Sequence, residues 1–365
     1  MTKGDPSLDG QSASRSLWRR LWWWIRYVLL GVCFLSLLGW SSLAVAFSNL
    51  PVGETSRQFL AGAVAATFLG LVVFSKRCWR VLGLLALYFA SVLTWFFLIP
   101  PSHDRVWGPE VGKLSHIEIE DNLITVHNLR NFEYSSVSDF TERWEERSYD
   151  LDKLQRMDYI ICDWGLGDIA HSMLSFEFED DGYLCFSVET RKESYESYST
   201  IRGFFRQFEL IIVVGAERDL IGQRIFARGE DVYVYPAKLS KDELDTLFME
   251  QVQRVNQLAE NPKWYNTLTT NCLTTLVFDR SVNERLMKID YRVLLNGRSP
   301  EMFYEGGRID TKLSYPDAKR TFQANQYLQE VGAIENLSQL IRPWRAFVSP
   351  SVSQSHPNHN AESDY

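Results

Sequence analysis

Three long apolar runs without a charged residue fill most of the first hundred positions of this 365-residue chain. They cover about residues 27–50, 58–75 and 81–100. Each reaches the roughly 18 to 20 residues that a helix needs to cross the hydrocarbon core of a bilayer. A cleaved signal peptide has a shorter apolar stretch and is not followed by further spans. The runs therefore predict three transmembrane helices over residues 27–100, preceded by a cytoplasmic N-terminal segment at 1–26.

The Lys and Arg residues near the span ends predict the orientation. Cytoplasmic loops carry an excess of these residues. They cluster before the first span and in the turn between the second and third, at Arg15, Arg19, Arg20, Arg26, Lys76, Arg77 and Arg80. The loop between the first two spans has only Arg57, offset by Glu54. We therefore expect everything after Pro100 to lie outside the cytoplasm.

The charge balance separates the front of the chain from the back. Residues 1–100 carry a net charge of +6, and the remainder carries −14. Residues 101–345 are numerous enough for one substantial domain, and their acidity argues against a nucleic-acid partner. Residues 1–14 are polar, and residues 346–365 are rich in Ser, His, Asn and Pro, so both ends are predicted to be disordered.

Strand-like runs come first in the predicted domain. Residues 117–120 and 123–129 flank Asp121-Asn122, and residues 172–179 and 183–190 flank Asp180-Asp181-Gly182, so each pair predicts a hairpin. Further apolar or alternating runs cover 158–164, 210–214 and 231–235.

Two helices are predicted after these strands. Ser240 followed by Glu243 is a capping box that opens a helix ending at Asn261-Pro262. A second helix should begin near Asn271 and continue through Phe278. The domain is therefore predicted to be α+β, with an antiparallel sheet and segregated helices.

Cys272 is the candidate nucleophile. It falls in the first turn of the second predicted helix, where backbone N–H groups and the helix dipole stabilise a thiolate. The domain holds three cysteines, Cys162, Cys185 and Cys272, so at least one thiol stays unpaired within it. The alternative is that Cys272 is a small buried residue beside a helix cap.

His171 is the candidate base for this thiol, because a thiolate nucleophile usually needs one within hydrogen-bond reach. If the second hairpin turns at Asp180-Asp181, two residues are cross-strand partners when their numbers add up to 361. This register sets His171 opposite Thr190. Glu189 is then adjacent and could orient the imidazole, although a one-residue slip would turn it away. His127 is the competing base.

Other chemistries lack a motif in the sequence. There is no Gly-rich phosphate loop, no His-Glu-x-x-His and no Cys-x-x-Cys, so we expect neither a cofactor nor a metal. A basic stretch could meet lipid headgroups or phosphate, but a solvated face is the favoured interpretation; it comprises Arg191, Lys192, Arg202, Arg206, Arg218 and Arg224.

From about Ile99 to Ile341 the chain resembles the bacterial family of the N-terminal periplasmic domain of Lnb, a lipoprotein N-acyltransferase. The matching stretches are IPPSHDR (99–105), VHNLRNF (126–132), AHSMLSF (170–176), VETRKE (188–193), RGFFRQFEL (202–210), RGEDVY (228–233) and WYNTLTTNC (264–272). The characterised member carries further spans after this domain, whereas every span predicted here precedes it.

This resemblance implies a circularly permuted, papain-like (NlpC-type) cysteine enzyme in which the histidine precedes the cysteine. The family's Cys–His dyad carries over onto Cys272 and His171. Asn271, Tyr265 and Asn266 belong to the cysteine motif and would shape the site or bind substrate, unless they only cap the helix.

The resulting hypothesis is a thiol acyl-transfer enzyme in the bacterial inner membrane. Its main domain would lie in the periplasm and act on membrane lipid or lipoprotein. Hydrolysis of cell-wall peptides and a non-catalytic, membrane-anchored binding module remain as alternatives. The acyl donor and acceptor and the oligomeric state stay open.

Overall fold

A computed structural model describes residues 7–50, 52–165, 168–277, 290–293, 295–328 and 336–345. Its described residues form two compact units. The helical unit joins Met1–Ser102 to two short later segments, Tyr198–Phe208 and Trp264–Thr267. The sheet unit holds the rest of the chain. The domain bounds expected from the sequence stay predictions, and both short segments fall inside the predicted catalytic domain.

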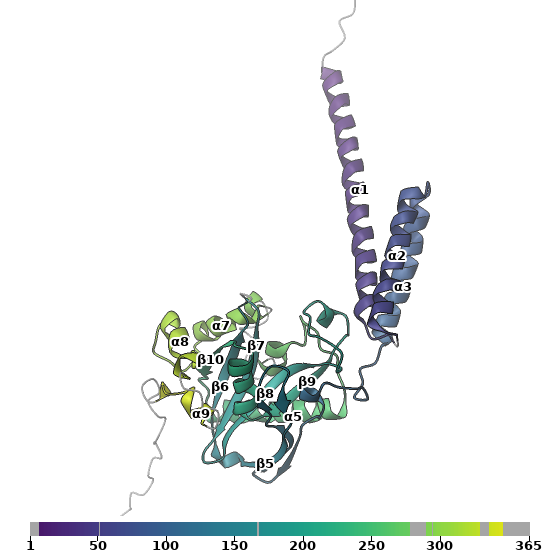
Figure 1. The fold of residues 1–365 in the computed structure, drawn as a ribbon. Coiled ribbons are helices and arrows are strands. Elements are labelled where there is room, and N and C mark those ends of the chain that lie inside the picture. Colours follow the sequence, from purple (N-terminus) through teal and green to yellow (C-terminus); the bar gives the residue numbers. More distant parts are fainter. Residues whose placement is uncertain are drawn as a thin grey trace, which may run out of the picture. The chain divides into compact units, whose positions relative to one another are not determined.

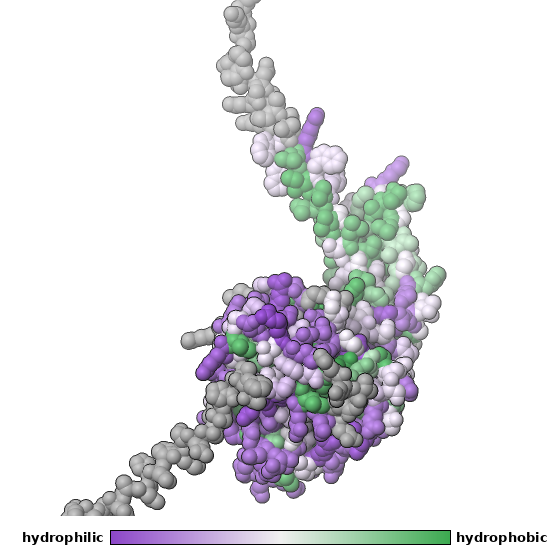
Figure 2. All heavy atoms as spheres, turned by 60° about the vertical axis from the view of Figure 1, so that its left-hand side comes forward, coloured by the Kyte–Doolittle hydropathy of each residue, from purple (hydrophilic) through white to green (hydrophobic). Residues whose placement is uncertain are grey.

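The three predicted apolar helices are present in the helical unit (Figure 1). They are α1 (Ser7–Phe47), α2 (Glu54–Phe74) and α3 (Cys78–Leu98). All three are long and apolar enough to cross a membrane, and Figure 2 shows hydrophobic side chains along them. Helix α1 starts at Ser7, so the disorder predicted for residues 7–14 is wrong.

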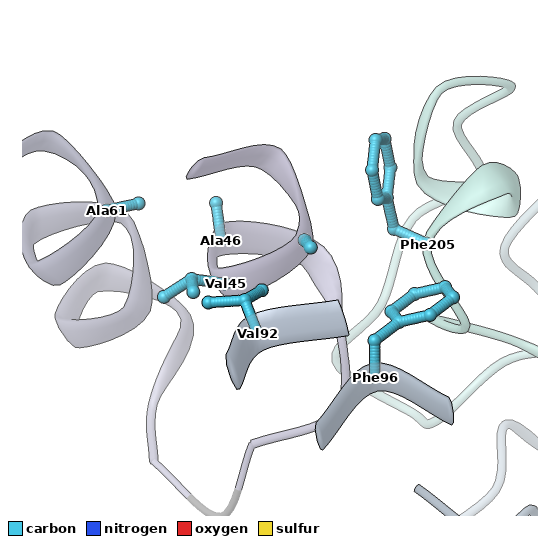
Figure 3. Close-up of a cluster of buried hydrophobic side chains, with 7 residues drawn as sticks. Val45, Ala46, Ala61, Val92, Phe96 and Phe205 are labelled. Atoms are coloured by element: carbon cyan, nitrogen blue, oxygen red, sulfur yellow. The ribbon is translucent and has the colours of Figure 1, made fainter. Parts of the chain in front are cut away.

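Two apolar clusters hold the three helices together. One is built around Leu85, which is fully buried beside Phe34 and Val81. The other joins Phe96 of α3 to small side chains of α1 and α2 and to one residue from outside the helices, Phe205 (Figure 3). The helical unit therefore has a core of its own that includes a residue from a distant part of the sequence.

In the described part of the sheet unit, eight strands form one sheet in the order β1-β2-β9-β8-β7-β6-β10, with β5 paired to β2. The pairs are antiparallel, except that β2 meets β9 in parallel at one position. The strands are β1 (His116–Glu120), β2 (Leu123–Arg130), β5 (Trp144–Asp150), β6 (Leu154–Asp163), β7 (Ala170–Phe178), β8 (Gly182–Arg191), β9 (Glu209–Gly215) and β10 (Asp231–Pro236).

A separate ladder pairs β3 (Glu133–Tyr134) with β4 (Phe140–Thr141). The predicted α+β class and both predicted hairpins are confirmed. Strand β5 was not expected, because Trp144–Asp150 carries charged residues on an exposed edge and has no apolar alternation.

The register of the β7–β8 hairpin differs from the prediction by one residue. Met173 pairs with Ser187 and Phe178 with Gly182, so paired positions sum to 360 and not to 361. Three residues therefore make the turn, and both Asp180 (φ +65°) and Gly182 (φ +87°) adopt the left-handed conformation. This conformation is ordinary for glycine and tolerated by aspartate. A one-residue shift changes which side chains share a face.

Helix α5 (Lys241–Glu260) covers part of the sheet (Figure 1). The predicted capping box is present: Glu243 N–H donates to Ser240 Oγ, and Ser240 N–H donates to the Glu243 carboxylate. Phe248 is fully buried, and its ring meets three phenylalanines of the sheet edge-on at 5.1 to 6.0 Å, namely Phe176, Phe178 and Phe186. This aromatic contact fixes the helix on the strands that carry the candidate site.

The remaining helices are short: α4 (Glu217–Gly222), α6 (Cys272–Val277), α7 (Ser299–Glu305), α8 (Tyr315–Thr321) and α9 (Leu337–Leu340). The predicted second helix is confirmed as α6, although Phe278 lies outside the described residues. The tail predicted at 346–365 also lies outside them.

We expect Phe248→Ala to lower the free energy of unfolding of the sheet unit by about 3–5 kcal/mol, because it empties the centre of this aromatic contact. Phe248→Leu retains more apolar volume and should cost clearly less. Denaturant unfolding of the full-length protein in detergent measures both. Equal losses for the two variants would contradict the packing described here.

Candidate functional site

Cys272 is the first residue of α6, as its sequence context predicts. Asn271 caps the helix: its Oδ1 accepts from Thr274 N–H at 2.9 Å, and its own N–H donates to Thr274 Oγ1 at 2.9 Å. This reciprocal pair satisfies two groups at the helix start and holds the backbone on both sides of the thiol. Asn271 therefore has a defined role as a cap.

The Cys272 thiol is buried, with 7% of the residue exposed. Asn296 Nδ2 donates to Sγ at 3.1 Å, and Ala170 O lies 3.9 Å from it. Burial alone would raise the pKa of the thiol. Hydrogen bonds from His171 and Ser172 and the charge of His171 outweigh burial and lower that pKa below its ordinary value. The site therefore favours a thiolate.

His171, near the start of β7, faces the thiol from the sheet. Its Nε2 lies 2.8 Å from Ser187 Oγ and 3.2 Å from Glu189 Oε1. These two oxygens engage Nε2 and leave Nδ1, the other ring nitrogen, unused by them. Burial and the charge of Arg224 lower the pKa of His171, but Glu189 and Cys272 raise it to a value above the usual one. The charged imidazolium is therefore favoured beside the thiolate.

Besides its contact with His171, Glu189 accepts hydrogen bonds from Ser187 of β8 and from Arg224, which follows α4. Ser187 Oγ donates to its Oε1 at 2.8 Å, and Arg224 Nη2 donates to the same oxygen at 2.8 Å. Burial would raise the pKa of Glu189, but the positive charges of His171 and Arg224 hold it well below the usual range. The carboxylate stays ionised and can orient the imidazole.

The corrected hairpin register explains why Glu189 reaches His171. In the predicted register His171 opposes Thr190, which would turn Glu189 to the other face. The observed register, continued toward the strand ends, sets His171 opposite Glu189. Directly paired side chains share a face of the sheet. The predicted neighbour was therefore correct, although the register that suggested it was wrong.

Asn296 contacts both Cys272 and the residue before His171, and it was not predicted as a site residue. Its Oδ1 accepts from Ala170 N–H at 2.9 Å, and its Nδ2 donates to Ala170 O at 2.5 Å. These two bonds clamp the residue before His171 and fix the amide so that Nδ2 also faces Cys272. Nothing in the local sequence singles out this asparagine, because its role arises only from tertiary contact.

A series of hydrogen-bonded hydroxyl groups holds Asn296 in this position. Tyr159 OH lies 3.1 Å from Ser172 Oγ and 2.7 Å from Ser299 Oγ, and Ser299 Oγ donates to Asn296 O at 2.5 Å. Tyr159 is on β6, so the chain ties the strand beside β7 to the segment that carries Asn296. Burial raises the pKa of Tyr159, which keeps it a neutral donor.

The site residues lie within one region that also matches a known family. Residues 140–297 match the family described as the Lnb N-terminal periplasmic domain. This part of the chain is therefore similar to that family. No curated protein and no solved structure matches the chain. The protein therefore combines an Lnb-type domain with three helices long and apolar enough to cross a membrane.

The structure does not bring His127 to the Lnb-type site. His127 is on β2, which is separated from β7 by β9 and β8, and its Nδ1 lies 2.7 Å from Glu146. Neighbouring strands are about 4.8 Å apart, so this separation is about 14 Å. Tyr265 and Asn266 belong to the helical unit, and a site-shaping role for them stays a prediction.

The predicted solvated face of the basic stretch is wrong for Arg191 and Arg224, which are both buried. Arg224 pairs with Glu189 at 2.8 Å and with Glu230 at 3.4 Å. Arg191 donates to two backbone carbonyls and stacks on Trp107, 4.3 Å from the ring centroid. Charge alone could not reveal these partners, which come from distant segments.

The other cysteines of the Lnb-type domain are not part of this constellation. Cys162 and Cys185 are buried and unpaired, and burial raises the pKa of each thiol. Across the described ranges, no group of three or more His, Cys, Asp or Glu side chains is arranged to hold a metal ion.

We expect Cys272 to react with iodoacetamide at a pH below that of an ordinary thiol. His171→Gln should move the half-maximal pH upward, because the hydrogen bond and charge of His171 lower the pKa of the thiol. Mass spectrometry of the Cys272 peptide over a pH series measures this. His127→Gln is the matched control and should leave the curve unchanged. A shift of equal size in both variants would refute the assignment of His171.

Proposed function

We propose that the protein is a membrane-anchored periplasmic cysteine enzyme that transfers acyl groups through Cys272 and His171, with Glu189 as the third member. The observation that carries this proposal is the geometry of the site: the buried Cys272 thiol opens α6 and accepts from Asn296, and the buried His171 is held by Ser187 and Glu189. The lowered pKa of the thiol and the raised pKa of the histidine agree with it. Structural cysteines are inert when buried in apolar surroundings, whereas nucleophilic ones lie beside a cation and hydrogen-bond donors.

The proposed first step uses the Cys272 thiolate as the nucleophile and the His171 imidazolium as the acid. Cys272 Sγ attacks the carbonyl carbon of an ester, and the carbonyl electron pair moves to oxygen. The tetrahedral intermediate then expels the alkoxide, which takes a proton from His171 and leaves as the alcohol. A thioester on Cys272 and a neutral imidazole remain.

The second step returns the enzyme to its starting state. His171 accepts a proton from the acceptor, an amine or water, while the acceptor attacks the thioester carbonyl. Collapse of the second intermediate breaks the C–S bond and restores the thiolate beside the imidazolium. Throughout, Glu189 remains ionised and holds the ring orientation.

Asn296 supports an oxyanion site in this scheme. Its Nδ2 has two N–H groups, of which one bonds Ala170 O and the other is directed at Sγ. A carbonyl carbon bound to Sγ brings its oxygen within reach of this donor. A fixed donor at such a point stabilises developing negative charge without reorganising during the reaction.

The proposed arrangement is that of a circularly permuted papain-like core, with the histidine strand before the cysteine helix. Multi-pass insertion of α1–α3 in the bacterial inner membrane would confine the site to the membrane surface. Confinement raises the effective concentration of lipid or lipoprotein substrates. Support comes from the match to a periplasmic-domain family and from the three apolar helices.

Intact mass spectrometry of the full-length protein, incubated with phospholipid and a diacylated lipopeptide, tests this proposal. We expect an acyl adduct on wild type that is absent from Cys272→Ala and Cys272→Ser, while all three proteins accumulate. Full activity in Cys272→Ala would overturn the proposal. Peptide release from purified peptidoglycan without an acyl adduct would assign cell-wall hydrolysis instead.

Asn296→Ser should slow adduct formation by roughly 100- to 1,000-fold, the usual effect of losing one oxyanion donor. The control is alkylation of Cys272 at a pH where every thiol is ionised, which should stay near the wild-type rate. If adduct formation persists at the wild-type rate, Asn296 is not an oxyanion donor.

A further inference from the structure

Two short segments of the chain fold with the membrane helices although their neighbours in sequence belong to the sheet unit. Tyr198–Phe208 lies between β8 and β9, and Trp264–Thr267 follows α5. Both are assigned to the helical unit by their contacts. We refer to these two segments, with the parts of α1, α2 and α3 that they contact, as the clasp.

The first segment of the clasp binds the end of α3. Arg206 Nη1 donates to the carbonyl oxygens of Phe96 at 2.8 Å and Ile99 at 3.0 Å. The last carbonyls of a helix lack partners within the helix, so the guanidinium satisfies groups that would otherwise need water. Arg206 holds φ at +52°, which a non-glycine residue adopts rarely and keeps only where its surroundings dictate it.

The same segment contributes to the core of the helical unit and pairs with a helix start. The Phe205 ring lies 6.2 Å from both Trp40 and Phe47, and Figure 3 shows it beside Phe96. Arg202 Nη2 bonds Glu54 in the first turn of α2 at 2.5 Å. Apolar, ionic and carbonyl contacts together therefore attach this segment to the helices.

The second segment is bound to the first one and to Ile99, the residue that follows α3. Trp264 Nε1 donates to Ile99 O at 3.2 Å, and Thr267 Oγ1 donates to Thr200 O at 2.9 Å. A Cβ atom at Gly203 would lie 2.4 Å from Thr267 Oγ1 and 3.2 Å from Tyr265 Cε1. Only glycine allows the two segments to approach this closely.

The second segment leads directly to the candidate nucleophile. Only four residues, 268–271, separate Thr267 from Cys272. Six residues, 192–197, separate the first segment from the end of β8, the strand that carries Glu189. A short tether of this kind limits the positions that the start of α6 can reach.

We infer that Arg206 and Trp264 are positioning residues, which fix the segment Trp264–Thr267 and thereby hold the short stretch of chain that leads to Cys272. This inference rests on the proposed function. A simple anchor needs only the covalent link after α3, and the contacts of the clasp would then be superfluous. Hydrogen bonds to Sγ weaken steeply with small displacements, so a fixed tether preserves them.

The test compares Arg206→Gln and Trp264→Phe with wild type in full-length protein in nanodiscs. The readout is the pH dependence of Cys272 alkylation by iodoacetamide, measured on the Cys272 peptide. We expect the half-maximal pH of both variants to rise toward about 8.5, the value of a free cysteine. A rise of one unit lowers the thiolate fraction at pH 6 about tenfold. The curves should converge at high pH.

Two further variants distinguish a positioning role of Arg206 and Trp264 from a general destabilisation of the protein. Arg206→Lys keeps a cationic donor for the carbonyls and should restore much of the wild-type curve. Phe59→Leu alters an exposed side chain of α2 and should leave the curve unchanged. If Arg206→Gln does not accumulate, Trp264→Phe decides the outcome, because it removes one N–H and retains an aromatic ring.

Alkylation curves of Arg206→Gln and Trp264→Phe that coincide with wild type would overturn the inference and leave the helices as an anchor. The wild-type curve by itself tests the proposed nucleophile. A normal thiol curve in wild type would therefore count against the proposed function, whereas the difference between curves tests the clasp.

Discussion

The pairing of β7 with β8 is the constraint on which the site depends. It sets Ser187 and Glu189 on the face that His171 occupies, and Asn296 then clamps the backbone just before His171. Because side chains alternate between faces, no adjustment of a rotamer could compensate for a shift of one residue. The left-handed turn at Asp180–Gly182 is thus as important to the histidine as any group that contacts it.

Buried charge is the second constraint, and the sheet unit satisfies it with complete pairs. Arg130 forms two bonds of about 3 Å with Asp219, and Arg342 binds Asp158 at 2.6 Å and also Glu217. Removing one partner of such a pair costs several kcal/mol because it leaves an unpaired buried ion. In the Glu189–Arg224 contact only Arg224 is buried, and Glu189 is partly exposed, so the third member of the site also contributes to pairing a buried charge.

The local sequence predicts the helices and strands better than it predicts which distant segments they contact. The turn residues 180–182 predict the hairpin, but they do not decide whether Gly182 belongs to the turn or to the strand, and that ambiguity produced the wrong register. Helix α5 was predictable because its capping box and apolar face are both local. Asn296 and the clasp were not, because each depends on contacts between segments far apart in the chain.

The two unpaired thiols of the sheet have a consequence for how this domain matures. Cys162 on β6 and Cys185 on β8 lie on opposite sides of β7, and their partners on that strand, His171 and Ser175, are four residues apart. Two strand spacings alone exceed the roughly 7 Å that a disulfide can bridge. The finished sheet therefore protects both thiols from joining each other. An unfolded chain in an oxidising compartment has no such protection. Rapid pairing of β6, β7 and β8 therefore limits the time in which Cys162 and Cys185 could form a disulfide while the chain is unfolded.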